Sequence, residues 1–332
     1  MRILITGGAG YIGSHCALEL LKRGYEVTIL DNLEKGHQET LDTVRQLGGE
    51  YDFLRVDLRD IKSLREELRG KHFDCVIHFA AYLEVGLSVK NPAIFFENNV
   101  VGSQYLFQVL LENNIRNVIF SSSAAVYGTQ EVVPIKEDAG KHPDSPYGET
   151  KLLMERILEN YCRYAGMNAV ALRYFNPAGA QGSIGERHYP ETHAIPRLLR
   201  ALIDPAFKFG VYGDDYDTPD GSCIRDFIHI NDLVDAHIRC IDYLNTNKGF
   251  QTFNVATGTG TSVFELIKTA EGISGKKLNY EIQPRRGGDP AKLIADPGKI
   301  KSIMAWTAKH NIKEILESAW SFEINRPASD YN

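Results

Sequence analysis

The glycines near the amino terminus constrain the fold of this chain more than any other feature. In the opening MRILITGGAGYIGSH, Gly7, Gly10 and Gly13 lie in a G-x-x-G-x-x-G spacing between a short apolar run and a segment with helical periodicity. Such a strand-to-helix turn uses one glycine for its tight backbone, one where a pyrophosphate approaches closely and one for helix packing. The start of the helix adds free N–H groups for the anion. The turn therefore predicts dinucleotide binding.

Apolar runs alternate with helical segments through the first half of the chain. Strands are expected at 2–6, 26–31, 75–79, 118–121 and 169–174, and helices at 12–23, about 95–113 and about 146–164. The runs are continuously apolar, as in strands covered on both faces, so the alternation predicts a Rossmann-type, doubly wound parallel α/β sheet. Prolines and glycines cluster after residue 176. We expect an NAD-binding domain at 1–176 and a smaller mixed α/β substrate domain at 177–332, with interlaced segments.

Charge and cysteine content narrow the possible partners. A net charge of −6 and the lack of a basic stripe argue against nucleic acid or an anionic membrane. The five cysteines are scattered without a C-x-x-C pair, which predicts neither a disulfide framework nor a zinc site, and the sequence shows no cluster of metal ligands. No apolar run is long enough for a signal peptide or a membrane span. We expect a soluble, cytoplasmic protein that holds no metal.

An acidic residue closes the second expected strand. Asp31 lies about twenty residues after the glycine turn, where a carboxylate can accept hydrogen bonds from both adenosine ribose hydroxyls. This position favours NAD over NADP, whose 2′-phosphate would face Asp31, although the nearby base Lys35 leaves the preference open. Asp57, which follows the apolar FLRV run, either meets the adenine edge or caps the next helix.

A serine-ended strand and a tyrosine–lysine pair indicate catalysis. Ser121 and Ser123 follow the VIF run, and Tyr147 and Lys151 stand four apart in SPYGETK, on one face of an expected helix. The tyrosine–lysine pair alone is weak evidence for catalysis, because about one Tyr-x-x-x-Lys arises by chance among sixteen tyrosines. Because a predicted dinucleotide-binding turn precedes it in the same chain, the pair indicates that Tyr147 acts as a general base. A free tyrosine has a pKa of about 10, so a neighbouring cation must stabilise the phenolate.

Nine short motifs carry a family resemblance. GGAGYIGSH, DNL, HFAA, NNVVG, SSSAAVYG, SPYGETK, RYFNPAGA, CIRDFIH and RRGGD resemble the extended short-chain dehydrogenase/reductase family, and are most similar to its UDP-galactose 4-epimerases, from Met1 to about Trp306. The resemblance implies reversible 4-epimerisation of UDP-galactose and UDP-glucose through a 4-keto intermediate, with tightly bound NAD. It implies that Tyr147 takes the proton of the sugar 4-hydroxyl, that Lys151 stabilises the phenolate, and that Ser123 hydrogen-bonds the same oxygen.

The resemblance also assigns binding residues. Those implied for NAD are Gly7, Gly10, Tyr11, Ile12, Gly13, Asp31, Asn32, Asp57, Leu58, Phe79, Ala80, Ala81, Asn98, Ser121, Tyr147, Lys151, Tyr174 and Phe175. Those implied for the UDP-sugar are Ser123, Tyr147, Asn176, His193, Ala194, Val211, Tyr212, Arg225, Arg286, Asp289 and Leu293. Arg225 and Arg286 suit a diphosphate, because a guanidinium binds two oxygens at once, and Asp289 suits the uridine ribose. Asn98 could instead cap a helix, and His78 is expected only to pack at a strand end.

Two departures from the family pattern bear on the site. Leu83, in AAYLEV, stands where the best-known epimerases have a lysine beside the cofactor, so one charge contact is absent or replaced. Leu293 stands where a bulky tyrosine often restricts the sugar pocket. The smaller side chain makes UDP-N-acetylhexosamines plausible additional substrates.

Alternative functions remain open within the same fold. A 4,6-dehydratase needs an acidic pair after the serine, where this chain has Ala124 and Ala125. UDP-glucuronate and UDP-pentose epimerases stay possible, and a non-catalytic NAD-binding regulator is a remote alternative because fold does not fix function. The resemblance suggests a homodimer through the helices expected at about 95–113 and 146–164.

Overall fold

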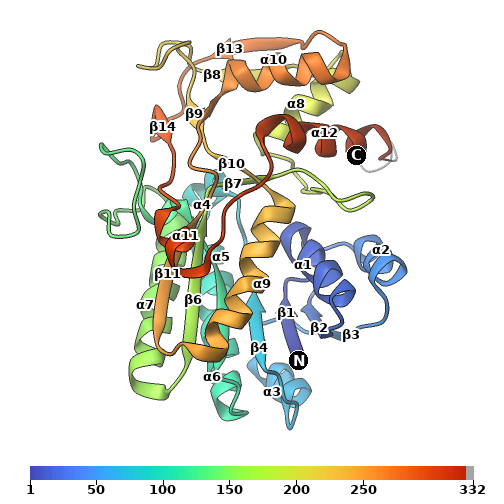
Figure 1. Ribbon diagram of the computed structural model, residues 1–332, viewed down its shortest axis with the longest axis vertical. Coiled ribbons are helices and arrows are strands. Elements are labelled where there is room, and N and C mark those ends of the chain that lie inside the picture. The colour runs from blue at the N-terminus through green and yellow to red at the C-terminus, as the bar shows by residue number, and fades with distance from the viewer. Residues whose placement is uncertain (327–332) are drawn as a thin grey trace.

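The computed structural model describes residues 1–326 and is built around a seven-stranded parallel sheet (Figure 1). Its strand order is β11-β6-β5-β4-β1-β2-β3. The strands are β1 (Arg2–Thr6), β2 (Glu26–Asp31), β3 (Asp52–Arg55), β4 (Cys75–His78), β5 (Asn117–Ser123), β6 (Asn168–Tyr174) and β11 (Phe250–Val255). The chain order reverses between β1 and β4, and ligands of such sheets bind outside the carboxyl ends of the strands at this point. The predicted doubly wound fold is confirmed, and the five expected strands are present with ends that differ from the expected ones by at most two residues.

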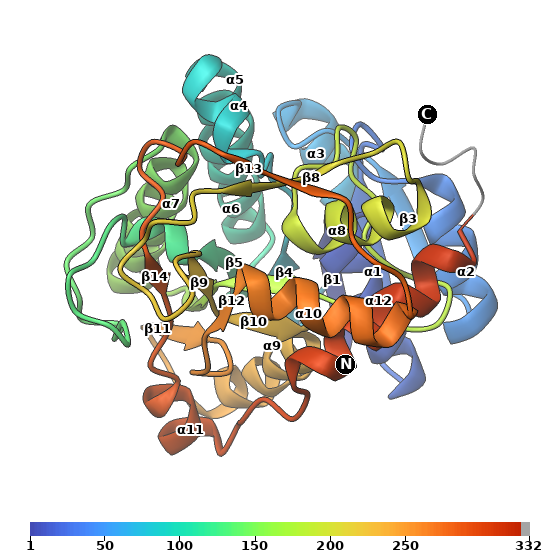
Figure 2. The same cartoon turned by 90° about the horizontal axis from the view of Figure 1, so that it is seen from above.

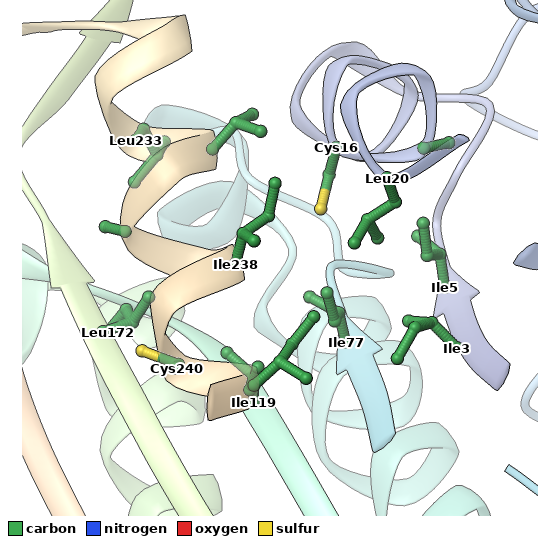
Figure 3. Close-up of a cluster of buried hydrophobic side chains, with 14 of the residues drawn as sticks. Ile3, Ile5, Cys16, Leu20, Ile77, Ile119, Leu172, Leu233, Ile238 and Cys240 are labelled. Atoms are coloured by element: carbon green, nitrogen blue, oxygen red, sulfur yellow. The ribbon is translucent and has the colours of Figure 1, made fainter. Parts of the chain in front are cut away.

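Helices cover both faces of the sheet because neighbouring strand residues point to opposite sides. Ile3 and Ile5 face one side, under α1 (Tyr11–Lys22), α2 (Gln38–Gly48) and α9 (Ile230–Thr246). Leu4 faces the other side, under α3 (Ile61–Leu68), α6 (Ser103–Glu112) and α7 (Pro146–Ala165). Figure 3 shows the first side, where Leu20 of α1 and Ile238 of α9 point toward isoleucines of the sheet. This two-sided burial explains the continuously apolar strands.

The helix expected over about 95–113 forms, and its middle is π-helical. After α4 (Val85–Lys90), α5 (Pro92–Phe95) continues without a break into a π-helix, η1 (Phe96–Gly102), and then into α6. Pro92 occupies the first turn of α5, where its missing N–H costs nothing. π-helical segments occur often at functional sites, and η1 contains the NNVV motif.

A smaller unit lies beyond the carboxyl ends of the strands. Its helices are α8 (Ala194–Ile203), α10 (Val263–Ser274) and α12 (Ile312–Ile324). It contains two two-stranded sheets, one of β7 (Asn176–Ala178) and β10 (Phe227–His229) and one of β8 (Phe209–Tyr212) and β13 (Tyr280–Gln283). A three-stranded sheet places β9 (Ile224–Arg225) between β12 (Thr261–Ser262) and β14 (Lys292–Leu293). Leu199, Leu266 and Leu316 belong to its own buried core. Figure 2 shows these elements lying over the end of the sheet.

The chain after residue 176 contributes to both units. It builds the smaller unit, but α9 packs against α1 and β11 adds the outer strand of the sheet beside β6. Helix α11 (Gly298–Met304) then contacts β11. In the described part of the chain, no helix has the length and apolar character needed to cross a membrane.

Candidate active site

The glycine turn between β1 and α1 is packed too tightly against neighbouring backbone to accept side chains at two of its positions. Gly7 has a φ of +72°, and a Cβ there would lie 2.6 Å from the backbone nitrogen of Ala80. A Cβ at Gly13 would lie 2.2 Å from the carbonyl oxygen of Gly7. Helix α1 begins after Gly10 without a side-chain cap, which leaves N–H groups of its first turn, including that of Ile12, for a phosphate. These features fit the pyrophosphate of a dinucleotide.

Asp31 lies buried at the carboxyl end of β2. Its two oxygens accept hydrogen bonds from the backbone N–H groups of Ala9 (3.0 Å) and Leu33 (2.9 Å). A carboxylate offers about four acceptor sites, so two can still receive ribose hydroxyls. Lys35, the nearest base, forms an ion pair with Glu84 at 2.9 Å. Because that cation is already engaged, the geometry favours NAD over NADP.

The region expected to hold the adenine contains an ion pair. Asp57 contacts Arg59 at 2.6 Å and accepts a hydrogen bond from Asn32 at 3.0 Å. The hydrogen bonds from Arg59 lower the pKa of Asp57 to about 2. The alternative role of Asp57 as a helix cap is wrong, because Asp60 caps α3. Leu58 is buried beside this pair, and the adenine contact stays a prediction.

The loop after β4 lies against the glycine turn. The backbone of Ala80 faces Gly7, Ala81 follows it half-buried, and the Phe79 ring lies 4.8 Å from the ring of His237. His78 ends β4, where it is buried and hydrogen-bonds Thr6 and Ser103. Its predicted role in packing is confirmed.

Leu83, which takes the place of the expected lysine, lies beside an ion pair between Glu84 and Lys35. Leu83 is half-buried, and its backbone N–H donates to the side chain of Glu84. Glu84 in turn binds Lys35 from the loop after β2. Lys35, paired with Glu84, therefore lies close to Leu83 in the structure.

The two asparagines of the π-helix η1, Asn98 and Asn99, differ in burial and in hydrogen-bond partners. Asn98 lies half-buried in η1 and donates to Asn99, so it does not cap a helix. Asn99 is buried and binds the backbone N–H and carbonyl of Tyr82 as well as the hydroxyl of Thr150. It thereby joins the loop after β4 to α7. The sequence analysis missed Asn99, although the doubled asparagine in ENNVVG marks the position.

The expected catalytic residues converge at the carboxyl end of β5. Ser123 ends this strand, and its hydroxyl lies near the side chain of Tyr147 in the first turn of α7, close enough to lower the pKa of that tyrosine. The Nζ atom of Lys151, one turn later, lies 5.8 Å from the centre of the Tyr147 ring. It donates to the carbonyl oxygen of Ser121 at 2.7 Å, which fixes its position. The structure therefore brings serine, tyrosine and lysine together as predicted from their spacing.

Burial sets the protonation of this group. It raises the pKa of Tyr147 to about 12, although the nearby hydroxyl of Ser123 opposes the shift. It also lowers the pKa of Lys151 to about 7, although Glu155 opposes that shift. Tyr147 is thus a phenol in this structure. It becomes a base only when additional positive charge stabilises its phenolate.

The end of β6 lies beside the catalytic group. Tyr174 is buried and its hydroxyl donates to the hydroxyl of Ser121. Phe175 follows it, and Asn176 begins β7, where its side chain binds the carbonyl oxygen of Asp226 at 3.0 Å. The three consecutive residues thus lead from the sheet into the smaller unit.

Charged residues expected to bind the nucleotide sugar are gathered in the smaller unit. Arg225 of β9 forms an ion pair with Asp289, and the guanidinium of Arg286 lies 3.6 Å from the centre of the Tyr212 ring. Tyr212 and buried Val211 end β8. Two guanidiniums beside a carboxylate and an aromatic face suit a diphosphate, a ribose and a base.

Leu293 packs close to the catalytic strand. It lies on β14 in register with Arg225, and it packs against a buried cluster that contains Ala124 and Phe175. Ala124 directly follows Ser123, so the cluster against which Leu293 packs extends to the end of β5. This placement agrees with its expected position at the sugar pocket.

Comparison with known families agrees with this geometry. A sequence model described as the NAD dependent epimerase/dehydratase family matches residues 3–256, a span that contains the glycine turn and the catalytic group. The chain belongs to this family. The resemblance inferred from the sequence motifs is confirmed.

Relatives of this epimerase/dehydratase chain match along nearly its whole length. It is 42% identical to a UDP-glucose 4-epimerase of Lactobacillus helveticus over 98% of both chains. A UDP-glucose 4-epimerase from Bifidobacterium longum, solved in complex with NAD+ and UDP, superposes with a TM-score of 0.94 at 36% identity over 100% of both chains. The UDP-Glc/GlcNAc 4-epimerase of Campylobacter jejuni gives a TM-score of 0.86 at 37% identity and covers 98% of this chain and 99% of its own.

A buried ion pair supports the catalytic helix of this epimerase/dehydratase chain. Glu155 lies one turn after Lys151 and binds the guanidinium of Arg173 on β6 with both oxygens, at 2.8 and 2.6 Å. Arg173 also donates to the hydroxyl of Tyr127, and Ser122 donates to Glu155. The sequence analysis missed these residues, because an arginine in a strand shows its partner only in three dimensions.

His193 lies in a cluster that the sequence analysis did not foresee. It precedes Ala194 at the start of α8, and its Nδ1 contacts Glu186. Burial lowers its pKa, but Glu186 raises it to about 9 overall. The fold places His188 and Glu191 beside this pair, so the expectation that the chain has no cluster of metal ligands is wrong. The signal was the E-x-H-x-x-E-x-H spacing of GERHYPETH.

Proposed function

We propose that the protein is an NAD-dependent UDP-glucose 4-epimerase that interconverts UDP-galactose and UDP-glucose. The observation that carries this proposal is the convergence of Tyr147, Lys151 and Ser123 at the end of β5, beside the glycine turn. Relatives with this activity in their names, about 40% identical over the full length, support it.

The residues of the site can move one proton. Tyr147 accepts the proton of the sugar 4-hydroxyl while Ser123 holds the same oxygen by a hydrogen bond. Lys151, fixed on the carbonyl of Ser121, stabilises the phenolate by its charge. The chemistry that bound NAD would supply here is reversible acceptance of the hydride from C4. The 4-keto sugar turns within the pocket between these steps, so Tyr147 returns its proton to the oxygen after the opposite face has received the hydride.

The residues of the smaller unit hold the nucleotide part of the substrate during this reaction. Arg225 and Arg286 bind the diphosphate, Asp289 the uridine ribose, and Tyr212 lies near the base. The present pairing of Arg225 with Asp289 keeps both side chains at the site. Firm binding of the nucleotide leaves the sugar free to rotate about its bond to the phosphate.

The pocket also accepts UDP-N-acetylhexosamines in this proposal. Leu293 packs near the catalytic strand and leaves more room than a tyrosine would. The similar Campylobacter jejuni enzyme is described as a UDP-Glc/GlcNAc 4-epimerase, which supports the broader range.

We further propose that two copies pair through η1, α6 and α7 in the cytoplasm. Val101 of η1 and Tyr164 of α7 are exposed hydrophobic residues, and Gln104 of α6 hydrogen-bonds Tyr161 of α7. The five cysteines are free thiols, as suits a reducing compartment. Light scattering after gel filtration is expected to give twice the monomer mass of 37.2 kDa, and a monomer mass contradicts the pairing.

The first experiment follows UDP-galactose by NMR without added NAD. Formation of UDP-glucose is expected, because the cofactor is held through purification. Tyr147→Phe is the matched control, since it removes one oxygen and keeps the ring. If neither UDP-galactose nor UDP-N-acetylgalactosamine reacts after NAD is supplied, the proposal fails, and UDP-glucuronate and UDP-pentoses are the next substrates to test.

A further inference from the structure

Four potential metal ligands meet in the segment between β7 and α8. Glu186, His188, Glu191 and His193 each offer one ligand atom, and these atoms all lie within 4.8 Å of one another. We propose that they bind a divalent transition-metal ion, with zinc as the expected ion, that fixes this segment beside the cofactor-binding crevice. Two imidazoles and two carboxylates form the nitrogen and oxygen ligand set that zinc accepts in tetrahedral sites.

The separations match such a site. Zinc bonds to nitrogen and oxygen are about 2.0 to 2.1 Å long, so tetrahedral ligand atoms lie about 3.3 Å apart. Nδ1 of His188 lies 3.2 Å from Glu186 and 3.8 Å from Glu191. Nδ1 of His193 contacts Glu186 and lies 4.0 Å from Glu191. Small side-chain rotations bring all four atoms onto one ion.

Two of the atoms lack hydrogen bonds despite these short separations. Nδ1 of His188 and Oε2 of Glu191 are buried and make no hydrogen bond within the described residues. The 3.2 Å contact of His188 with Glu186 therefore lacks hydrogen-bond alignment. Buried polar atoms are nearly always satisfied, and ligand atoms directed at a shared ion explain this exception.

Charge and access agree with a cation at this place. The side chains of Glu186 and Glu191 are 6% and 17% exposed, and burying two carboxylates is costly unless positive charge compensates them. A divalent ion that displaces the proton of His193 neutralises both carboxylates, and the imidazoles then bind as neutral ligands. His193 is 43% exposed, which provides an entry path. Four protein ligands leave no open position for a substrate, so the ion has a structural role.

The cluster lies beside the glycine turn, so a metal ion there would also affect the position of that turn. The His188 ring packs edge-on against Tyr11, the residue that follows Gly10 in the glycine turn. The hydroxyl of Tyr11 donates to the carbonyl oxygen of Gly179 at 2.7 Å. A metal-bound segment would hold Tyr11 from one side and the start of α8 from the other.

Metal content tests the proposal independently of activity. Tag-free protein is treated with EDTA, dialysed against excess zinc, desalted and analysed by mass spectrometry of the metal. We expect one zinc ion per chain in the wild type. His188→Ala and the milder Glu191→Gln should each weaken zinc binding by about tenfold or more. His72→Ala, which removes an exposed histidine elsewhere, should keep full zinc content.

Thermal unfolding supplies a second readout. Zinc should raise the melting temperature of the wild type and of His72→Ala, and at the same zinc concentration should raise that of Glu191→Gln by less, because the ion stabilises only the folded site. Cobalt in place of zinc should give the visible absorption of a tetrahedral ion. Wild type without stoichiometric zinc, or equal zinc in wild type and in both ligand variants, overturns the proposal and leaves the four residues as an imidazolium–carboxylate network.

Discussion

The buried ion pair behind the catalytic helix gives a sharp test of the structure. Glu155 and Arg173 are 3% and 1% exposed, and the carboxylate also accepts a hydrogen bond from Ser122. Glu155→Gln keeps the size of the side chain but leaves the guanidinium without its counter-charge. Breaking a buried pair costs about 3 to 5 kcal/mol. For 332 residues the unfolding entropy corresponds to about 1.4 °C per kcal/mol, so the melting temperature should fall by about 4 to 7 °C.

Scanning calorimetry of the cofactor-loaded protein measures this change. The matched control is Glu112→Gln, because Glu112 binds Arg65 with both oxygens in the same way, at 2.9 and 2.8 Å, but on the surface. Solvent screens that pair, so the control should melt almost like the wild type. Replacing Arg173 by methionine together with Glu155→Gln should recover part of the loss, since no charge is then left buried. Equal melting temperatures for the two single variants would refute the reasoning.

Four further predictions concern the site. Tyr147→Phe should lower kcat by about 10² to 10⁴-fold while bound NAD, measured after denaturation, stays unchanged; normal turnover contradicts the assigned base. Gly13→Ala should abolish NAD retention, because its Cβ would lie 2.2 Å from a carbonyl oxygen, whereas Gly272→Ala, in open space on α10, should retain it. Burial lowers the pKa of Lys151 from 10.5 to about 7, so between these values only the unfolded chain holds the proton. The unfolding free energy of the cofactor-free wild type should therefore rise with pH relative to Lys151→Met, measured in urea, and parallel curves would disprove the shift. Leu293→Tyr should lower kcat/KM for UDP-N-acetylglucosamine relative to UDP-glucose by about 10 to 200-fold, and an unchanged ratio would remove this residue from substrate selection.

The amino-acid sequence alone predicted five of the seven strands of the sheet, the glycine turn and the catalytic group, whereas β3 and β11 were not among the expected strands. Strand and helix periodicities are local properties, and the positions of Gly7, Gly13, Tyr147 and Lys151 follow from spacing within one turn or one helix. The structure changed these elements by only a few residues. The helix expected at about 95–113 is present, but spacing did not show that residues 96–102 are π-helical and place Asn99 between two elements.

Only the tertiary structure decided which distant residues meet. Glu155 and Arg173 lie on a helix and a strand, and Arg225 and Asp289 are 64 positions apart, so no local pattern pairs them. The four ligands of the proposed metal site are close in sequence, yet their side chains face one another only because the segment folds back between Tyr11 and α8. Periodicity records which face of an element is buried, whereas the partner of a buried charge depends on how separate elements pack.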